Sequence, residues 1–357
     1  MTDPQVILQD RSPSRVSHSG REQAAGHALA IDLGTHSTQI YAVGRGIVLS
    51  EPSLAAVDRE SGLVVAVGWG AGKALRNDPA RLEPVRPLRR GVVADFEVAE
   101  QILSYFLHKV RRRVYGVYGR VFGSLLKPKV LVCVPAGATS LELSTAKRVA
   151  LAAGARKART MEGPLAAAIG AGNAVDEMRG SMIVDVGGGK TEAAIISMGE
   201  IVAGTSVRTG GDDLDAAIRS HVRKEFVLSI DLQEAERLKI ELGSALPLEE
   251  VEFAEVSGLD LLTRDSKTIL VSTEEAHDAM KGCVATIAET VRATFENTPA
   301  ELVADVAEGG IVLCGGGTRL RLLEDLLRYK VGVPVSTAKE PVRCAAVGAG
   351  RTLGGRQ

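Results

Sequence analysis

The chain has 357 residues, of which 45% are hydrophobic and 24% are charged, and its formal net charge is −1. This composition is typical of a soluble globular protein with room for two lobes, and the balanced charge gives no reason to expect nucleic acid as a partner. The 4 cysteines are widely spaced and no apolar run is long enough to cross a bilayer, which favours free thiols and argues against a transmembrane helix. Residues 1–26 are polar, lack the hydrophobic segment of a signal peptide and are predicted to form a disordered tail.

The first part of the folded chain is predicted to form short strands joined by tight turns. Apolar residues 28–33 and 38–43 give the first two strands, with glycine and small polar residues between them. Further short strands follow, and then a brief helix over residues 69–75. Residues 79–87, which begin and end with proline, are predicted to be a loop.

A long helix and a basic, aromatic stretch come next. Asp95 can cap a helix that runs to about Arg113, because its apolar residues recur at intervals of three and four. Residues 114–126 then combine apolar and aromatic side chains with glycines, between two groups of basic residues. A buried strand is predicted over residues 129–134.

The second half of the chain repeats the pattern of the first. Helices over residues 141–153 and 165–174 lead to an apolar strand at 182–186, which turns through three glycines into strands at 192–197 and 201–205. This recurrence of the meander after about 150 residues indicates an internal duplication. The later predictions are helices over residues 214–226, 232–242 and 273–297, a strand pair over 251–259 and 267–271, a strand with glycines over 308–317, a helix from about 319, and a small-residue helix over 345–350.

Two aspartates stand at matching places in this duplicated pattern. Asp32 and Asp185 each follow an apolar strand and precede glycine. An acid there can hold Mg²⁺ through water, and the glycines allow backbone N–H groups to approach phosphate oxygens. A single motif of this kind is usually only a turn. Two copies in matched strands, with a third glycine loop at 314–318, favour a site in which loops from both halves of the chain contact one phosphate group.

Three motifs together resemble a known superfamily. In order they are Ile31-Asp32-Leu33-Gly34-Thr35, Val184-Asp185-Val186-Gly187-Gly188-Gly189 and Val312-Leu313-Cys314-Gly315-Gly316-Gly317. They resemble the actin, heat-shock chaperone and sugar-kinase ATPases, and the segments 46–53, 86–96, 166–172 and 235–243 are most similar to the MreB-like bacterial actins. The resemblance runs from residue 28 to about residue 353.

The resemblance implies an α/β fold of the actin-like ATPase type. Two duplicated ribonuclease H-like lobes would surround a nucleotide cleft, and each lobe would carry a smaller subdomain. The expected division is a tail at 1–26, lobe I at 27–160 with its subdomain at about 50–91, and lobe II at 161–357 with its subdomain at about 207–272. The C-terminal helix is expected to return to lobe I.

The resemblance also implies ATP or ADP with Mg²⁺ as the ligand, with Asp32 and Asp185 holding the metal through water. Glu236 and Lys239 would flank the adenine, although helix charges of this kind more often face solvent. The residues expected to bind the nucleotide are Gly34, Thr35, His36, Ser37, Gly187, Gly188, Gly189, Lys190, Gly211, Asp212, Glu236, Arg237, Lys239, Gly315, Gly316, Gly317 and Thr318.

Two positions depart from the pattern of the MreB-like actins. Gly163 stands where a glutamate is expected before the proline, and Lys190 stands where a threonine is expected after the glycines. Both groups act on the attacking water, so the resemblance implies weak hydrolysis with retained ATP binding. Lys190 could also pair with the γ-phosphate. Glu162 and Thr191, each one residue away, are the candidates to replace the missing groups.

The basic and aromatic stretch carries a separate expectation. In the similar proteins the corresponding loop contacts the inner membrane, and here Val121, Phe122, Leu125 and Leu126 lie among arginines and lysines, which suits anionic lipid. The alternative is an extended helix end that packs on its own lobe.

The leading hypothesis is therefore a cytoplasmic, MreB-like actin, peripheral to the inner face of the membrane. It would assemble with itself, with other MreB-type filaments and with the cell-wall synthesis machinery, and would help to set cell shape. One alternative is a non-polymerising ATP-binding scaffold. A chaperone-like ATPase would need a substrate domain after Gln357, and a small-molecule kinase would need a further catalytic acid.

Overall fold

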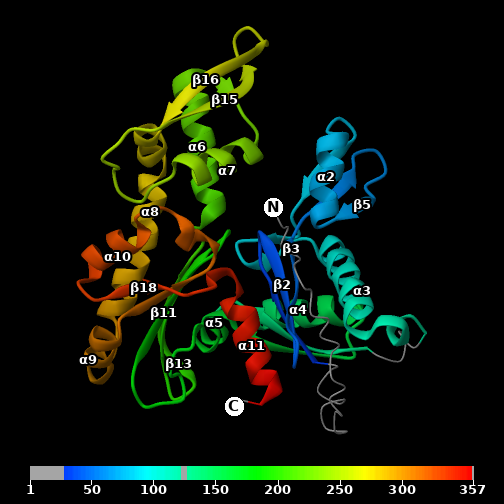
Figure 1. Cartoon of the computed structure of the whole chain (residues 1–357), viewed down its shortest axis with the longest axis vertical. Helices are drawn as coiled ribbons and strands as arrows, with labels where there is room; N and C mark the ends of the chain where they lie inside the picture. The colour runs from blue at the N-terminus through cyan, green and yellow to red at the C-terminus, as the bar shows by residue number, and fades with distance from the viewer. Residues whose placement is uncertain (1–27, 122–126, 356–357) are drawn as a thin grey trace, which may run out of the picture.

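The computed structural model describes residues 28–121 and 127–355, with the backbone alone for residues 115–121. The predicted tail and the predicted membrane residues Phe122, Leu125 and Leu126 lie outside the described residues, as does the side chain of Val121. Within these ranges the chain forms two lobes, each built on a five-stranded sheet, and two helices lie between the sheets (Figure 1).

The two sheets share one topology. The first has the strand order β10-β9-β1-β2-β3 and the second the order β13-β12-β11-β17-β18. In each, an antiparallel meander begins with a strand that also pairs in parallel with a later strand, β1 with β9 and β11 with β17. The strands of the first sheet are Ala28–Leu33 (β1), Ser37–Ala42 (β2), Gly46–Pro52 (β3), Lys129–Val134 (β9) and Lys157–Glu162 (β10). Those of the second are Ser181–Val186 (β11), Thr191–Ser197 (β12), Glu200–Val207 (β13), Ile311–Cys314 (β17) and Val335–Thr337 (β18). The predicted duplication is thereby confirmed.

Each lobe carries a smaller sheet at the upper end of Figure 1. On lobe I, the three strands β4 (Ala55–Asp58), β5 (Val64–Val67) and β6 (Leu82–Val85) pack with α2 (Trp69–Asn77) around a separate small core. On lobe II, the strands β14 (Leu228–Ser229), β15 (Phe253–Asp260) and β16 (Ser266–Ser272) form the second small sheet. A two-stranded hairpin of β7 (Leu88–Arg89) and β8 (Val92–Val93) follows the first small sheet.

The loop predicted over residues 79–87 is wrong, because β6 lies within it. Leu82 is buried in the small core, and β6 pairs antiparallel with β4. Pro84 is compatible with this strand because β6 is at the edge of the order β5-β4-β6, where a missing N–H costs no internal hydrogen bond. The segment between the two bounding prolines therefore contains an edge strand instead of being a loop throughout.

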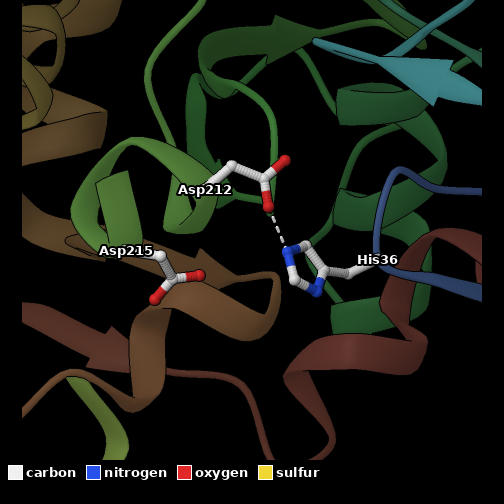
Figure 2. Close-up of side chains that lie close together, drawn as sticks. All are labelled: His36, Asp212 and Asp215. Carbon is white, nitrogen blue, oxygen red and sulfur yellow. Dashed lines mark hydrogen bonds and ion pairs between the residues drawn. The ribbon is translucent and has the colours of Figure 1, made fainter. Parts of the chain in front are cut away.

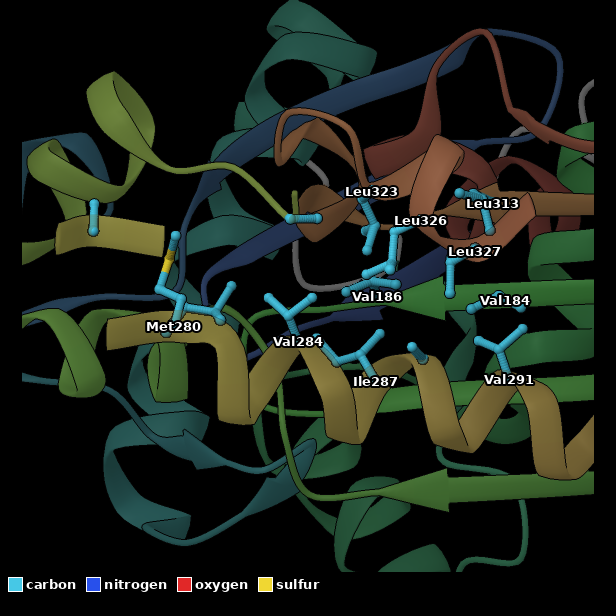
Figure 3. Close-up of a cluster of buried hydrophobic side chains, with 14 of the residues drawn as sticks. Val184, Val186, Met280, Val284, Ile287, Val291, Leu313, Leu323, Leu326 and Leu327 are labelled. Atoms are coloured by element: carbon cyan, nitrogen blue, oxygen red, sulfur yellow. The ribbon is translucent and has the colours of Figure 1, made fainter. Parts of the chain in front are cut away.

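Helices cover the outer faces of both sheets. Lobe I has α3 (Phe96–Val121) and α4 (Ser140–Ala152), and lobe II has α8 (Thr273–Glu296), α9 (Ala300–Gly309) and α10 (Leu323–Val331). Two more helices of lobe II, α6 (Gly211–Phe226) and α7 (Leu232–Leu242), pack together beside its small sheet. Met280, Val284, Ile287 and Val291 lie three or four residues apart on α8 and pack toward Val186 of β11 and the leucines of α10 (Figure 3).

The helices of the structure differ from the predicted ones in several places. The first long helix continues past Arg113 to Val121, and α9 was not predicted. The helix expected from about residue 319 is preceded by a 3₁₀ turn, Gly316–Arg319, and starts at Leu323. Leu322 has a φ of 57°, a left-handed conformation that separates the turn from the helix.

Helices α5 (Gly163–Ala171) and α11 (Cys344–Gly354) pack together at the base of the two lobes. Their backbones touch: a Cβ at Gly170 would overlap the carbonyl of Cys344, and one at Gly348 would overlap that of Ala166. The surrounding core contains residues of both sheets, including Ala30 of β1. The C-terminal helix therefore contacts lobe I, and the loops at the ends of β1, β11 and β17 face a common space above it.

Candidate functional site

A cavity with a volume of about 1110 Å³ lies between the lobes. It is bounded by the ends of β1, β11 and β17, and by α7. The sequence-predicted residues that line it are Asp32, Gly34, Thr35, His36, Ser37, Gly163, Asp185, Gly187, Gly188, Gly189, Lys190, Gly211, Glu236, Lys239, Gly315, Gly316 and Gly317. Residues more than 280 positions apart in the chain are thus brought together around one space.

The first two glycine loops meet across this cavity. In the β1–β2 turn the Gly34 N–H donates to the Ser37 carbonyl at 3.1 Å, and in the β11–β12 turn the Gly187 N–H donates to the Lys190 carbonyl at 2.9 Å. A Cβ at Gly188 would overlap the His36 ring, and one at Gly189 would lie 2.8 Å from the Thr35 hydroxyl. The close approach of the two turns therefore depends on glycine at positions 188 and 189 of the β11–β12 turn.

The two aspartates lie in an environment that disfavours their charges. Burial, and then the neighbouring Asp185 carboxylate, raise the pKa of Asp32 to about 7. Burial also raises the pKa of Asp185 to about 6, while the Lys190 ammonium opposes the shift. Carboxylates that are buried near one another need a cation, and hard oxygen ligands of this kind fit Mg²⁺.

A charge network crosses the rim of the cavity from lobe I to lobe II. His36 Nε2 contacts the Asp212 carboxylate, as Figure 2 shows, and His36 Nδ1 lies 3.7 Å from Glu236 Oε1. Donor atoms of His36, Asp212 and Asp215 lie within 4.8 Å of one another, a spacing that could suit a metal. However, the Lys239 ammonium is 2.8 Å from Asp215 Oδ1 and already supplies the positive charge there.

Asp215 is a cavity neighbour that sequence analysis missed. It is 4% exposed, and burial raises its pKa to about 6, against the opposing effect of Lys239. The available signal was a charged residue beside Leu214 on the apolar face of α6, where a carboxylate requires a partner.

Five of the predicted cleft residues do not line the cavity, namely Glu162, Thr191, Asp212, Arg237 and Thr318. Arg237 forms ion pairs along its own helix, and the Thr318 hydroxyl donates to the Gly315 carbonyl at 2.8 Å. The Thr191 hydroxyl donates to the Thr209 carbonyl at 2.8 Å, and Glu162 Oε1 accepts from the Gly137 N–H at 3.3 Å. The two candidate replacement groups are therefore engaged elsewhere.

Comparison with known proteins agrees with this architecture. The family model described as MreB/Mbl protein matches residues 26–357, nearly the whole chain. The chain belongs to the MreB/Mbl family. It is 41% identical over 329 residues to the cell shape-determining protein MreB of Escherichia coli strain K12, which covers 91% of this chain and 92% of that protein.

Solved structures extend the likeness of this MreB/Mbl chain to three dimensions. MreB5 of Spiroplasma citri bound to ADP has a TM-score of 0.81 and 30% identity, over 90% of this chain and 94% of that one. A MamK double helical filament subunit has a TM-score of 0.72 over 92% of this chain and all of its own, at 19% identity, and so shares the fold. The resemblance and the actin-like two-lobed fold inferred from the motifs are confirmed.

In this MreB/Mbl chain, the two positions that depart from the family pattern, Gly163 and Lys190, both lie next to Glu192, which was not among the predicted site residues. Glu192, on β12, is 1% exposed, lines the cavity and is paired with Lys190. A Cβ at Gly163 would lie 3.6 Å from Glu192 Oε2. The signal was a charged residue in the otherwise apolar run of β12.

None of the described helices is both long and apolar enough to cross a membrane.

Proposed function

We propose that this chain binds ATP or ADP together with Mg²⁺ in the cavity between its lobes. The observation that carries the proposal is the convergence of three glycine loops and two aspartates on one space large enough for a nucleotide. Asp32 and Asp185 would hold Mg²⁺ through water, and the metal would neutralise charge on the phosphate oxygens. Glu236 and Lys239 on α7 are available to the adenosine. The ADP-bound and AMPPNP-bound structures of MreB5 support this assignment.

Hydrolysis in this site is expected to be weak. Gly163 offers no side chain to a water, and the Lys190 ammonium cannot accept a proton from one. Glu162 and Thr191 have partners outside the cavity, at Gly137 and Thr209, which supports the same conclusion. The backbone of the three glycine loops and the two aspartates remain in place, so nucleotide binding is expected to be retained with Gly163 and Lys190 present.

The nucleotide-bound protein is proposed to assemble into filaments that help to set cell shape. The support is membership of a family whose relatives include a cell shape-determining MreB, together with a fold shared with a filament-forming MamK. The filaments would lie in the cytoplasm against the inner membrane face, through residues 121–126, and would meet other MreB-type filaments and the cell-wall synthesis machinery. Family membership favours this function over a chaperone-like ATPase or a small-molecule kinase.

One preparation can test binding and assembly together. Trp69 is the only tryptophan of the chain and lines the cavity with 68% of its surface exposed, so its fluorescence should change when ATP–Mg²⁺ binds. The Asp32→Asn plus Asp185→Asn variant should lose that response. Sedimentation with ATP should yield a pellet of filaments. Saturable binding without a pellet would instead favour the non-polymerising scaffold, and no binding would refute the nucleotide site.

A further inference from the structure

Glu192 joins the two lobes at the floor of the cavity. It belongs to β12 of lobe II, and its buried Oε2 is paired with the Lys190 ammonium of the same lobe. Its Oε1 accepts a hydrogen bond of 2.8 Å from the Ala136 N–H, in the segment that follows β9 of lobe I. One buried carboxylate is therefore held at once by a cation of its own lobe and by the backbone of the other.

Lys190 contacts lobe I as well. Gly91 lies in the turn between β7 and β8, with a φ of 80°, a conformation that favours glycine. A Cβ at Gly91 would lie 2.7 Å from Cδ and 2.8 Å from Cε of Lys190, which shows how closely the lysine stem covers this turn. The lysine is 18% exposed, so its ammonium is only partly solvated. Lys190 and Glu192 thus contact two separate segments of lobe I. Lys190 packs on the turn at Gly91, and Glu192 accepts a hydrogen bond from Ala136.

Because Gly163 has no side chain, it leaves room for the paired side chains of Lys190 and Glu192. A Cβ there would lie 3.4 Å from the Val134 carbonyl and 3.6 Å from Glu192 Oε2. An acidic side chain at this position would bring a second negative charge toward Glu192, whereas glycine leaves Lys190 as its charged partner. The two departures from the family pattern, at 163 and 190, are therefore linked through Glu192.

We propose that Lys190 and Glu192, through their contacts with Gly91 and Ala136, form an interlobe tie that holds the cavity closed before nucleotide binds. Removing one partner of a buried ion pair leaves the other uncompensated, so either substitution should loosen both contacts with lobe I. A closed cavity also slows exchange of its contents. This last consequence rests on the proposed nucleotide binding, but the tie itself does not.

Amide hydrogen exchange of the nucleotide-free protein tests the tie directly. In Glu192→Leu and Lys190→Met, peptides that contain Gly91 or Ala136 should exchange on the order of tenfold faster than in the unaltered protein. Glu51→Gln is the matched control, because Glu51 is also buried and paired with a lysine, Lys109 at 2.5 Å, but within lobe I. It should leave both peptides unchanged.

The outcomes separate the tie from the nucleotide site. Unchanged exchange at both peptides in a folded Lys190→Met variant would overturn the tie, even if Glu192→Leu did not fold. Glu192→Gln, which retains an acceptor for Ala136 but loses the ion pair, should show a smaller change in the same direction. Release of a fluorescent ATP analogue should be several-fold faster in the same variants. Failure of the unaltered protein to bind that analogue would refute the nucleotide site alone.

Discussion

Gln39 and Glu192 occupy equivalent positions in the two sheets. Gln39 pairs with Asp32 across β1 and β2, and Glu192 pairs with Asp185 across β11 and β12. Both side chains are 1% exposed, and both residues line the cavity. The duplicated lobes therefore present an aspartate and a longer polar residue in the same arrangement, but lobe II adds a carboxylate where lobe I has an amide. This asymmetry makes Lys190 important to the charge balance of the site.

Neutralising Asp32 should stabilise the nucleotide-free protein while abolishing its proposed binding of Mg²⁺ with the nucleotide. Its pKa is raised to about 7, so the native state retains a proton that the unfolded state releases near pH 4, and the free energy of unfolding falls as pH rises through this window. At pH 8, Asp32→Asn should be more stable by about 1–2 kcal/mol, less than the full shift implies because Asp32 lines the cavity and is only partly buried. Urea unfolding with a chelator present measures this difference. The advantage should shrink toward pH 4, and an equal advantage at both pH values would contradict the assignment.

Restoring both family residues should restore hydrolysis. Gly163→Glu with Lys190→Thr should raise ATP turnover roughly 10–100-fold, because a water-positioning carboxylate and hydroxyl return to the cavity. Phosphate release at saturating ATP–Mg²⁺ is the measurement. Gly163→Gln with Lys190→Thr is the matched control, since it fills the same space without a basic oxygen. Equal turnover in both double variants would mean that another group acts on the water.

The crossing of α5 and α11 should not tolerate a single added methyl group. In Gly348→Ala the new Cβ would overlap the Ala166 carbonyl, which belongs to a helix backbone and cannot rotate away. We expect a loss of about 2 kcal/mol or more in the free energy of unfolding, measured by thermal or urea unfolding. Gly282→Ala is the control. Its Cβ would meet nothing within 4 Å on α8, so it should stabilise the protein by about 0.5–1 kcal/mol.

Membrane contact through residues 121–126 can be tested by vesicle flotation. Phe122→Ser with Leu125→Ser should reduce binding to vesicles that contain anionic lipid, because both apolar burial and the position of the basic residues are affected. Leu262→Ser is a suitable control, since Leu262 is 79% exposed on the β15–β16 hairpin. If the double variant floated as well as the control, the membrane role would be lost.

The sequence predicted those parts of the fold and site that depend on local pattern. The strand-aspartate-glycine motifs at Asp32 and Asp185 identified both sheets and the edge where they meet, because apolar runs and tight turns are encoded over a few residues. Glu192 was missed because its partner Ala136 is 56 residues away and only the tertiary structure brings them together. The loop prediction over residues 79–87 failed for a similar reason, since the pairing of β6 at a sheet edge is a property of strand order.

The glycine contacts between α5 and α11 also determine how the lobes can move. Backbone meets backbone there, without intervening side chains that could change rotamer, so this crossing can adjust little while the helices stay in contact. Rotation of one lobe against the other should therefore pivot at this point. Displacements would grow with distance from the pivot and be greatest at α2 and at the β15–β16 hairpin, the ends farthest from it (Figure 1). A sub-ångström adjustment at the cavity floor would therefore become a larger movement at these two outer ends.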